Sequence, residues 1–297
     1  MSVYSIRDLE KLTGIKKHTI RIWEQRYRII TPRRTDTNIR YYTDDELRLL
    51  FNVALLNRNG YKISKLAKMQ PEEIAGVVSG IAEQPSNPNK QIDSLTLAML
   101  NLDEYAFERI FVAHADEFGF ENTMVQLVYP LLENLKSLWI TRSVSPAHEK
   151  FVSHLIRRKL LCAIDATPLP NSRNTEVFYL YLPEGESQEL TLLFMHYLLR
   201  QREFRVIYLG NGTSLGDLRD ACGTLQPDYV FTILDVPLAR QSIQHYLDTA
   251  ALAVEGSELL VTGTQVFLNE VKLPSNARLL SGMQDTLQFL SDLRKRN

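Results

Sequence analysis

The sequence predicts a multidomain protein of mixed α+β and α/β class, in which a winged helix-turn-helix is followed by a four-helix bundle and a doubly wound parallel sheet. Three observations support this prediction. Two short amphipathic patterns meet at Gly14 ahead of a basic segment, four longer helical patterns come next, and short apolar runs alternate with helical patterns from Glu176 onward. We expect domains at residues 1–75, 92–168 and 174–297, with a proline-containing linker at 84–91.

Composition narrows the class of protein. The chain has 297 residues, of which 44% are hydrophobic and 23% are charged, which is enough for two or three cores and unlike a disordered chain. No apolar run reaches the length of a membrane span and no apolar signal segment opens the chain, so we expect a cytoplasmic protein with no membrane partner. Cys162 and Cys222 lie far apart without a zinc-ligand pattern, which predicts buried free thiols and no metal site.

The two signs of charge are separated along the chain. Residues 1–70 carry 15 Lys and Arg against 7 Asp and Glu, a net charge of +8, whereas residues 71–297 carry 19 against 28, a net charge of −9. A solvated charged face is the alternative interpretation, but solubility alone does not require this separation. The basic N-terminal part therefore predicts binding to the phosphate backbone of a nucleic acid.

The first two helical patterns form a helix-turn-helix. Ser5 can cap the first helix with Asp8 as its capping-box partner, and Gly14 ends that helix where a left-handed residue is needed. The second helix starts at about Lys17 and leaves Lys17, His18, Arg21 and Gln25 facing outward. A helix of this kind enters the major groove of DNA by its N-terminal end.

Roles in DNA binding follow from position on this helix and on the basic hairpin after it. Arg21 is the strongest candidate for reading bases, because arginine can bind guanine O6 and N7. Tyr27, Arg28, Arg33 and Arg34 lie beyond the helix, where side chains hold phosphates. The full set of candidate DNA-binding residues is Lys16, Lys17, His18, Thr19, Arg21, Arg26, Tyr27, Arg28, Arg33, Arg34, Arg40 and Tyr41.

More helices follow the hairpin. The capping box of Thr43 and Glu46 opens a long helix that Gly60 closes, and a short helix runs from about Ile63 to Lys68. Ser145 and Pro146 start the last helix of the bundle as cap and first residue. The bundle helices are predicted at residues 92–101, 103–118, 120–141 and 146–167.

The N-terminal residues closely resemble the DNA-binding domain of the MerR family of bacterial transcription regulators. The resemblance covers residues 2–70 and rests on Tyr4-Ser5-Ile6, Leu9 to Ile15, Thr19 to Glu24, Pro32-Arg33-Arg34, Asn38 to Tyr42 and Asp45-Glu46-Leu47. Lys16 departs from the usual capping serine, and Asn38-Ile39 replaces the usual Gly-Tyr of the wing turn. The resemblance implies a homodimer, or a higher oligomer, on a two-fold promoter operator at which RNA polymerase also acts.

The C-terminal part predicts parallel strands joined by helices. Because ligands of such sheets bind beyond the C-terminal strand ends, the loops at 183–188, 210–214, 235–237 and 263–265 form the candidate pocket rim. We interpret Gly210-Asn211-Gly212 as a turn, with phosphate binding as the alternative. The strands are predicted at residues 177–182, 205–209, 229–234, 259–262 and 278–280, and the last helix at 286–294.

A MerR-like head, a helical bundle and a flavodoxin-like domain, in this order, look like the cobalamin-binding photoreceptor regulators of the CarH and LitR type. That family carries Glu/Asp-x-His-x-x-Gly in the first strand-to-helix loop, where the histidine ligates cobalt. Here the motif falls on Glu186 to Thr191, with Gln188 in place of the histidine and Thr191 in place of the glycine. An amide has no basic ring nitrogen and is a poor cobalt ligand, so cobalamin is a candidate cofactor that these replacements disfavour.

Other positions of the family's corrin site are partly kept. Its Ser-x-Leu falls on Thr232-Ile233-Leu234 and its Gly-Gly on Gly263-Thr264. Its Trp matches Trp139, and the Glu of its Glu-His ten positions later matches Glu149, whereas Lys150 replaces the histidine. The alternative interpretations are a bundle-core aromatic for Trp139 and a first-turn carboxylate that complements the helix dipole for Glu149.

Three hypotheses follow. The first is a DNA-binding regulator that has lost histidine ligation of a corrin and responds to another ligand, a partner protein or dimerisation alone. The second is a regulator that still binds cobalamin and can respond to light. The third is an enzyme such as a cobalamin-dependent mutase or methyltransferase subunit, which nothing favours because the sequence has no triad spacing, metal cluster or Walker loop. We therefore expect no enzyme activity.

Overall fold

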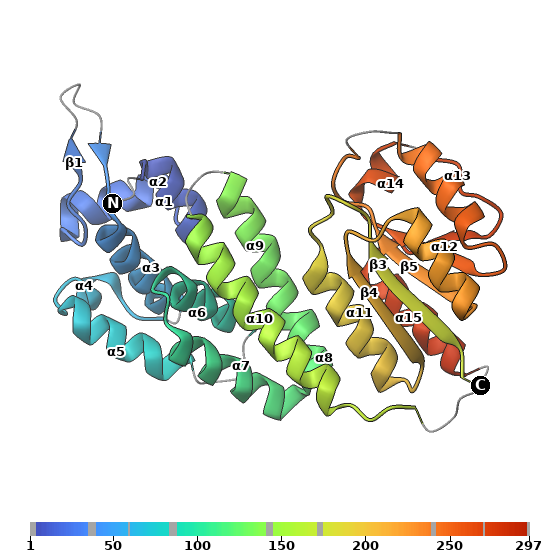
Figure 1. The fold of residues 1–297 in the computed structure, drawn as a ribbon. Helices are drawn as coiled ribbons and strands as arrows, with labels where there is room; N and C mark the ends of the chain where they lie inside the picture. Colours follow the sequence, from blue (N-terminus) through green and yellow to red (C-terminus); the bar gives the residue numbers. More distant parts are fainter. Residues whose placement is uncertain are drawn as a thin grey trace. The chain divides into compact units, whose positions relative to one another are not determined.

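The computed structural model of the chain describes residues 4–34, 40–58, 60–82, 88–140, 145–170, 175–238, 242–269 and 271–295 (Figure 1). The chain forms two compact units, Met1–Leu155 and Ile156–Asn297. The first unit contains the N-terminal helices, a short hairpin and most of the bundle, and the second contains the end of the last bundle helix and a five-stranded sheet. Within the described residues, no helix combines the length and the apolar character that crossing a membrane requires.

The first unit begins with a helix-turn-helix whose first helix is capped at both ends as predicted. The N–H of Asp8 donates to Ser5 Oγ at 3.3 Å, and the N–H of Ser5 donates to the Asp8 carboxylate at 2.8 Å, so α1 (Ile6–Thr13) starts with a capping box. Gly14 ends α1 in the left-handed region with φ of +68°. The next elements are α2 (Lys17–Ile22), a π turn η1 (Trp23–Tyr27), β1 (Arg33–Arg34), β2 (Arg40–Tyr41), α3 (Asp44–Arg58) and α4 (Ile63–Leu66).

Helix α5 (Pro71–Ala82) is not among the predicted elements. Its start carries ordinary N-terminal signals: a proline at the first position, acidic residues at Glu72 and Glu73, and a 2.8 Å hydrogen bond from the N–H of Gln70 to the Glu73 carboxylate. Helix α6 (Pro88–Leu100) also differs from the prediction, because it begins inside the predicted linker 84–91. A proline needs no N–H partner in the first turn, so Pro88 starts a helix there. Residues 84–87 lie outside the described part of the chain.

The predicted bundle helices are present with similar bounds. The third predicted helix, 120–141, contains a π turn just before Pro130. Proline cannot donate a hydrogen bond inside a helix and crowds the preceding turn, which accounts for the wider turn at this place. The elements are α7 (Glu104–Phe118), α8 (Phe120–Thr123), η2 (Met124–Val128), α9 (Tyr129–Ile140) and α10 (Pro146–Ala166).

The cysteine prediction is half wrong. Both thiols are free, and Cys222 is buried, but Cys162 is exposed on α10. The buried residues Ile156 and Leu160 mark the packed side of this helix. Position 162 lies about 200° around the helix from position 160, so its side chain faces away from that side.

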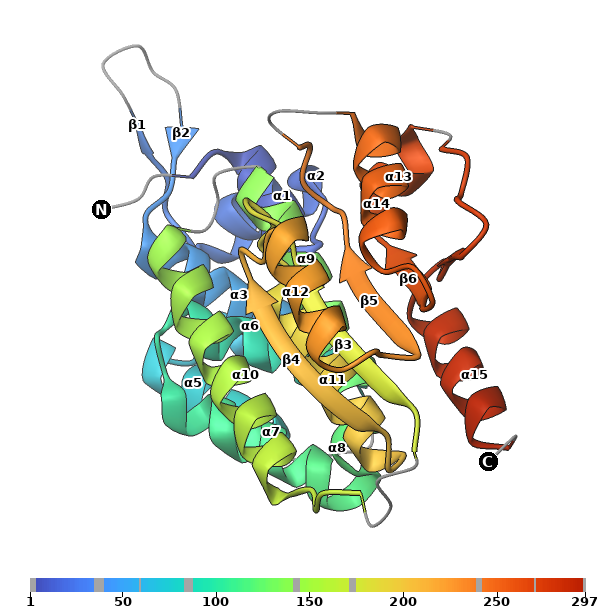
Figure 2. The ribbon, with the colours of Figure 1, turned by 45° about the vertical axis from the view of Figure 1, so that its right-hand side comes forward.

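The second unit confirms the predicted doubly wound, flavodoxin-like sheet. All strand pairs are parallel, and the spatial order is β4-β3-β5-β6-β7, which is the order 2-1-3-4-5 of flavodoxin-like folds. Figure 2 shows α11 and α12 on opposite faces of this sheet. The elements are β3 (Val177–Leu182), α11 (Glu189–Gln201), β4 (Arg205–Asn211), α12 (Leu215–Thr224), β5 (Tyr229–Ile233), α13 (Ile243–Ala253), β6 (Glu258–Thr262), α14 (Thr264–Leu268), β7 (Ala277–Leu279) and α15 (Met283–Arg294).

Strand β3 is the centre of this unit. All six of its residues are buried, as expected for a strand covered on both faces of a parallel sheet. One face carries Tyr179 and Tyr181 and packs with residues of α12 and α13 in a single apolar cluster. The carboxyl end of β3 leads into the loop that carries Glu186 and Gln188, so the fold brings the predicted pocket rim to one edge of the sheet.

Candidate functional sites

Helix α2 is held by an apolar contact on one side and is open to solvent on the other. Leu9 of α1, Ile20 of α2 and Trp23 are buried, which fixes the second helix against the first. The opposite side exposes Lys17, His18, Arg21 and Gln25, as the helical period predicts. Of the other predicted DNA-binding residues, Lys16, Arg26 and Arg28 are exposed, and Thr19 and Tyr27 are half-buried.

Ile22 was not predicted as a functional residue. Its side chain is 48% exposed, although it is a large apolar residue on a short helix. It lies four positions after His18 and directly after Arg21, on the face of the helix that carries the exposed cations. Apolar side chains can contact the methyl group of thymine in the major groove. The sequence signal was available, because position 22 falls outside the buried seam of Ile20 and Trp23.

At the start of α2, Lys16 occupies the position where a capping serine is usual. Lys16 is the N-cap residue, with φ of −58° and ψ of 136°, and its side chain makes no capping hydrogen bond. The Lys16 ammonium instead lies 4.0 Å from the Glu10 carboxylate, and three quarters of the lysine side chain is exposed. The helix N-terminus therefore keeps its free N–H groups and gains a nearby cation, a combination that favours an anion.

The hairpin after the helix carries exposed arginines on its first strand. Strands β1 and β2 are antiparallel, with Arg33 opposite Tyr41 and Arg34 opposite Arg40. Arg33 and Arg34 are exposed, whereas Tyr41 and Arg40 are half-buried. The predicted wing turn at Asn38-Ile39 lies outside the described residues.

Glu24 connects the hairpin to the helices. Its carboxylate lies 3.3 Å from Arg40 Nε and accepts a 3.0 Å hydrogen bond from the Tyr42 hydroxyl. Burial raises the pKa of Tyr42, and the hydrogen bond to Glu24 raises it further, so this hydroxyl stays a donor. Tyr42 also forms a two-way backbone bridge with Tyr4 at 2.9 Å in each direction. Arg40, predicted to contact DNA, is thus engaged in orienting the hairpin.

A second group of cations lies on and beside α4. Lys62, Lys65 and Lys68 line a groove of about 490 Å³ together with Tyr61, whose ring centre is 6.0 Å from the Lys65 ammonium. These residues were not predicted to bind DNA. The signal was the spacing of three lysines at intervals of three, which places neighbouring members of the series on one side of a helical segment.

The C-terminal edge of the sheet is closed by hydrogen bonds among its own loops. Gln188 Nε2 donates to the Asp235 carboxylate at 2.6 Å, and the N–H of Thr264 donates to the other oxygen of that carboxylate at 2.7 Å. Glu186 is buried and accepts from the N–H groups of Asp235 at 2.7 Å and Val236 at 3.0 Å. Loops from β3, β5 and β6 therefore hold one another through Glu186 and Asp235.

The two remaining predicted corrin-site positions on the sheet are tightly enclosed. Thr232 is fully buried, and its hydroxyl neighbours that of Tyr181, which forms a 3.0 Å hydrogen bond with Tyr246. Burial raises the pKa of Tyr181 to about 12, although its hydrogen bond with Tyr246 acts in the opposite direction. Gly263 has φ of +118°, and a side chain there would overlap the backbone of Leu234. Only glycine fits this place.

The bundle carries the other two predicted corrin-site residues. Trp139 lies in α9 and Glu149 in α10, where Glu149 is exposed in the first turn of its helix. Both belong to the first unit, and Gln188, Thr232 and Gly263 belong to the second. Among the described residues, no three His, Cys, Asp or Glu side chains are grouped as a metal site would require.

Comparisons with known proteins bear on both units. Residues 4–73 match the family described as MerR HTH family regulatory protein. The chain is 29% identical over 237 residues to the HTH-type transcriptional repressor CarH of Myxococcus xanthus. The aligned region covers 76% of this chain and 77% of that protein. It is 27% identical over 231 residues to the repressor CarA of the same organism, over 76% and 74% of the two chains.

A solved structure adds evidence on the fold. The monomethylamine corrinoid protein of Methanosarcina barkeri matches with a TM-score of 0.52 and 11% identity, over 69% of this chain and 99% of that one. At this identity the likeness concerns the fold alone. Together with the relatives named above, it confirms both resemblances predicted from the sequence.

Proposed function

We propose that this chain, which is a MerR-type transcriptional regulator with a cobalamin-binding-like C-terminal domain, binds double-stranded promoter DNA as a homodimer through α2 and the hairpin. The observation that carries the proposal is the solvent-facing side of α2 and η1, where Lys17, His18, Arg21 and Gln25 are exposed while Ile20 and Trp23 are buried on the other side. Hydrogen-bonding side chains at this spacing suit base edges in a major groove.

The other exposed groups fit a division of labour on DNA. Arg33 and Arg34 on β1 and the lysines of α4 would hold phosphates, which fix the position of the protein without reading sequence. Arg40 would act indirectly, because its contact with Glu24 orients the hairpin. Ile22 would contact a thymine methyl beside the base read by Arg21. The promoter is then the site at which RNA polymerase is regulated, in the cytoplasm.

We further propose that the C-terminal domain does not ligate a corrin through histidine. The residues do not fit that group: Gln188 has no ring nitrogen, and its amide is bound to Asp235. Thr191, in place of the small glycine, directs its hydroxyl to the Gln188 side-chain oxygen at 3.4 Å. The loop is thus satisfied by its own residues, which supports regulation by another ligand, a partner protein or assembly.

The alternative is a regulator that still binds cobalamin without a histidine ligand. The observation that favours it is the fold, which matches a corrinoid protein over nearly all of that protein's length. The retained positions Thr232 and Gly263 on the sheet would then contact the corrin or its side chains. A light response would belong to this alternative.

Binding to the promoter is tested by fluorescence anisotropy of labelled duplexes from the DNA upstream of the protein's own gene. We expect a preferred fragment that binds at least about a thousandfold more tightly than random DNA, as specific regulators do. A random duplex of the same length and base composition is the control. Equal affinity for every fragment across moderate salt concentrations would contradict the proposal.

The corrin question is tested by gel filtration after incubation with adenosylcobalamin in the dark. We expect no co-eluting corrin absorbance from the natural chain. Gln188→His should introduce corrin absorbance, and Gln188→Asn is the matched control that changes the side chain without supplying a ring nitrogen. Corrin bound to the natural chain would support the alternative, and no gain with Gln188→His would show that the missing imidazole does not limit binding.

A further inference from the structure

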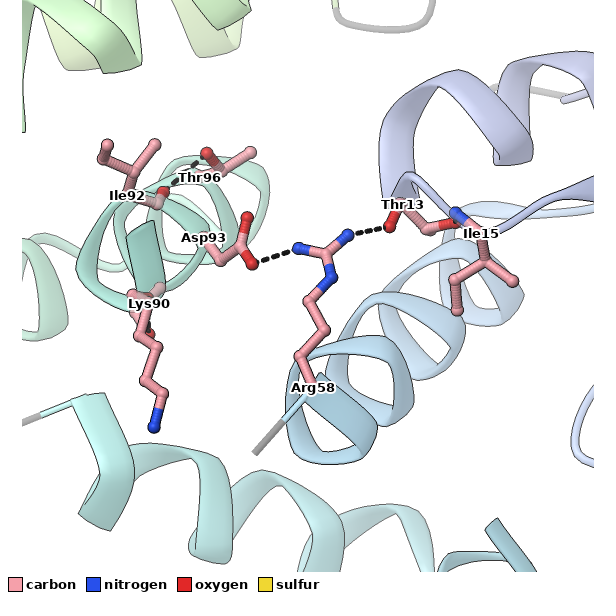
Figure 3. Close-up of polar contacts among 8 residues, drawn as sticks. Thr13, Ile15, Arg58, Lys90, Ile92, Asp93 and Thr96 are labelled. Atoms are coloured by element: carbon pink, nitrogen blue, oxygen red, sulfur yellow. Dashed lines mark hydrogen bonds and ion pairs between the residues drawn. The ribbon is translucent and has the colours of Figure 1, made fainter. Parts of the chain in front are cut away.

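Arg58 joins three helices of the first unit. It is the last residue of α3, and its guanidinium donates one hydrogen bond to the backbone carbonyl of Thr13 and another to the carboxylate of Asp93 on α6 (Figure 3). Thr13 is 45 residues away in the sequence and Asp93 is 35 residues away. One side chain thus contacts the end of α1 and the first helix of the bundle at the same time.

The contact with Thr13 falls at the turn that carries α2. Thr13 is the last residue of α1, and Gly14 follows in the left-handed region. The guanidinium comes so close that a Cβ atom on Gly14 would lie 2.7 Å from its nitrogen. A cation that donates to a free carbonyl at a helix C-terminus complements the helix dipole and acts as a cap. Arg58 therefore supports the turn from which the exposed face of α2 is aimed.

The contact with Asp93 is not explained as a source of stability. The Asp93 side chain is 21% exposed, and that of Arg58 is 46% exposed. Burial raises the pKa of the Asp93 carboxyl, and this effect outweighs the lowering by Arg58. Folding therefore favours the neutral form of Asp93, and the ionised form lowers the stability of the native state at neutral pH. The pair with Arg58 lowers this cost without removing it, and the contact fixes the direction of the guanidinium.

We propose that Asp93 and Arg58 are positioning residues for operator recognition, through which the first bundle helix sets the pose of α2. Asp93 holds one arm of the guanidinium, so the other arm points at the Thr13 carbonyl and supports the turn before α2. Ile92 next to Asp93 is buried, so the backbone of α6 at this point is anchored in the bundle. The inference rests on the proposed binding of promoter DNA and adds the residues that connect the bundle to it.

The test compares Asp93→Asn with the natural full-length chain. The amide keeps the shape of the carboxylate and removes its charge, so we expect an unchanged or slightly higher melting temperature. We expect operator affinity to fall about three- to tenfold, the range of coupling between neighbouring residues of one network, with no change in affinity for random DNA. Arg58→Gln should lower operator affinity similarly, and the double variant should lose little more than either single one.

A matched control is available on the same helix. Arg48 of α3 forms an exposed pair with Asp45 at 4.0 Å, so Arg48→Gln removes a comparable charge without changing the contact with the turn at Thr13. We expect Arg48→Gln to leave the ratio of operator to random affinity unchanged. An equal loss with this variant would overturn the positioning role, because it would reduce the effect to net charge.

Two further outcomes would also overturn the inference. Unchanged operator affinity in Asp93→Asn would show that the bundle does not act through this contact. A fall in melting temperature that accounts for the loss of binding would make the contact merely structural. Failure of the proposed function is recognised separately, because then the natural chain itself would show no preference for any promoter fragment.

Discussion

On α2 and η1, Arg21 and Gln25 are exposed to solvent, whereas at the C-terminal edge of the sheet Gln188 and Asp235 are hydrogen-bonded to each other. Both places carry motifs of a binding site. Polar groups exposed to water lower the stability of the protein little when no partner is bound, because water forms hydrogen bonds with them. Partly buried groups without a ligand must be satisfied by the protein, and the loops of β3, β5 and β6 do this through Glu186 and Asp235.

The difference teaches which site still needs a partner. The exposed face of α2 has hydrogen-bond donors that become buried only when an external partner binds. At the edge of the sheet, Gln188, Glu186 and Asp235 are hydrogen-bonded to one another's loops in the absence of any ligand, so a ligand there would have to replace these internal bonds.

The closed edge should be intolerant of any side chain at Gly263. Gly263→Ala would push a methyl group into the backbone of Leu234 at a positive φ, so we expect a loss of about 3 kcal/mol or more in local stability. Hydrogen exchange of β5 and β6 in the full chain measures this loss. Gly185→Ala is the control: its φ is +87°, but nothing lies within 4 Å, so it should cost only about 1 kcal/mol. Equal costs would mean that the edge is not tightly packed.

The open face should respond through binding alone. Arg21→Ala is expected to weaken operator binding by about 1–3 kcal/mol and to relax sequence preference, because it removes a base contact. Arg33→Ala should weaken binding to all duplexes and reduce the salt dependence by about one unit of slope, because it removes a phosphate contact. Anisotropy titrations at several salt concentrations separate the two. If both variants affected specific and random DNA equally, this division of roles would be wrong.

The sheet unit should lose stability in acid through His196. Burial, together with the charge of Arg200, lowers the pKa of His196 from 6.5 to about 4. The unfolded chain then binds a proton below pH 6.5 that the native chain does not accept until about pH 4, so native stability falls as pH drops through this window. His196→Gln should remove about 1–2 kcal/mol of the difference in unfolding free energy between pH 7.5 and pH 5.

Urea unfolding followed by circular dichroism measures this change. The exposed His245 of the same unit provides a control, because His245→Gln removes a histidine from the surface and not from the packed interior. An unchanged profile in His196→Gln would mean that this ring is protonated as easily in the native chain as in the unfolded one.

The smallest expected effect is a gain in the stability of α2. Lys16→Ser should supply the capping hydrogen bond that α2 lacks and add about 0.5–1 kcal/mol to the stability of that helix. The lost pair with Glu10 is long and exposed and contributes little. Hydrogen exchange of α2 measures the gain, with Lys16→Ala as the control that removes the charge without providing a cap. A gain with alanine of the same size would exclude capping as the cause.

Much of the fold could be predicted because its signals are local. The strand of Val177–Leu182 was predicted with its observed bounds, and the capping box of Ser5 and Asp8 is present as expected. Helix α5 was not predicted, although Pro71, Glu72 and Glu73 form an ordinary helix start. The residues of the candidate DNA-binding site were predicted from their types and positions, but the ion pair between Arg40 and Glu24 was not predicted.

The sequence by itself determined the features that depend on near neighbours: the periodicity that exposes Arg21, the glycine turn at Gly14, the parallel sheet, and the absence of a ring nitrogen at Gln188. Only the tertiary structure decided which partners these groups bind. Arg58 bonds to Thr13 from 45 positions away in the sequence, and Gln188 bonds to Asp235 from 47 positions away. No local pattern encodes such pairs, since they form only when separate elements pack together.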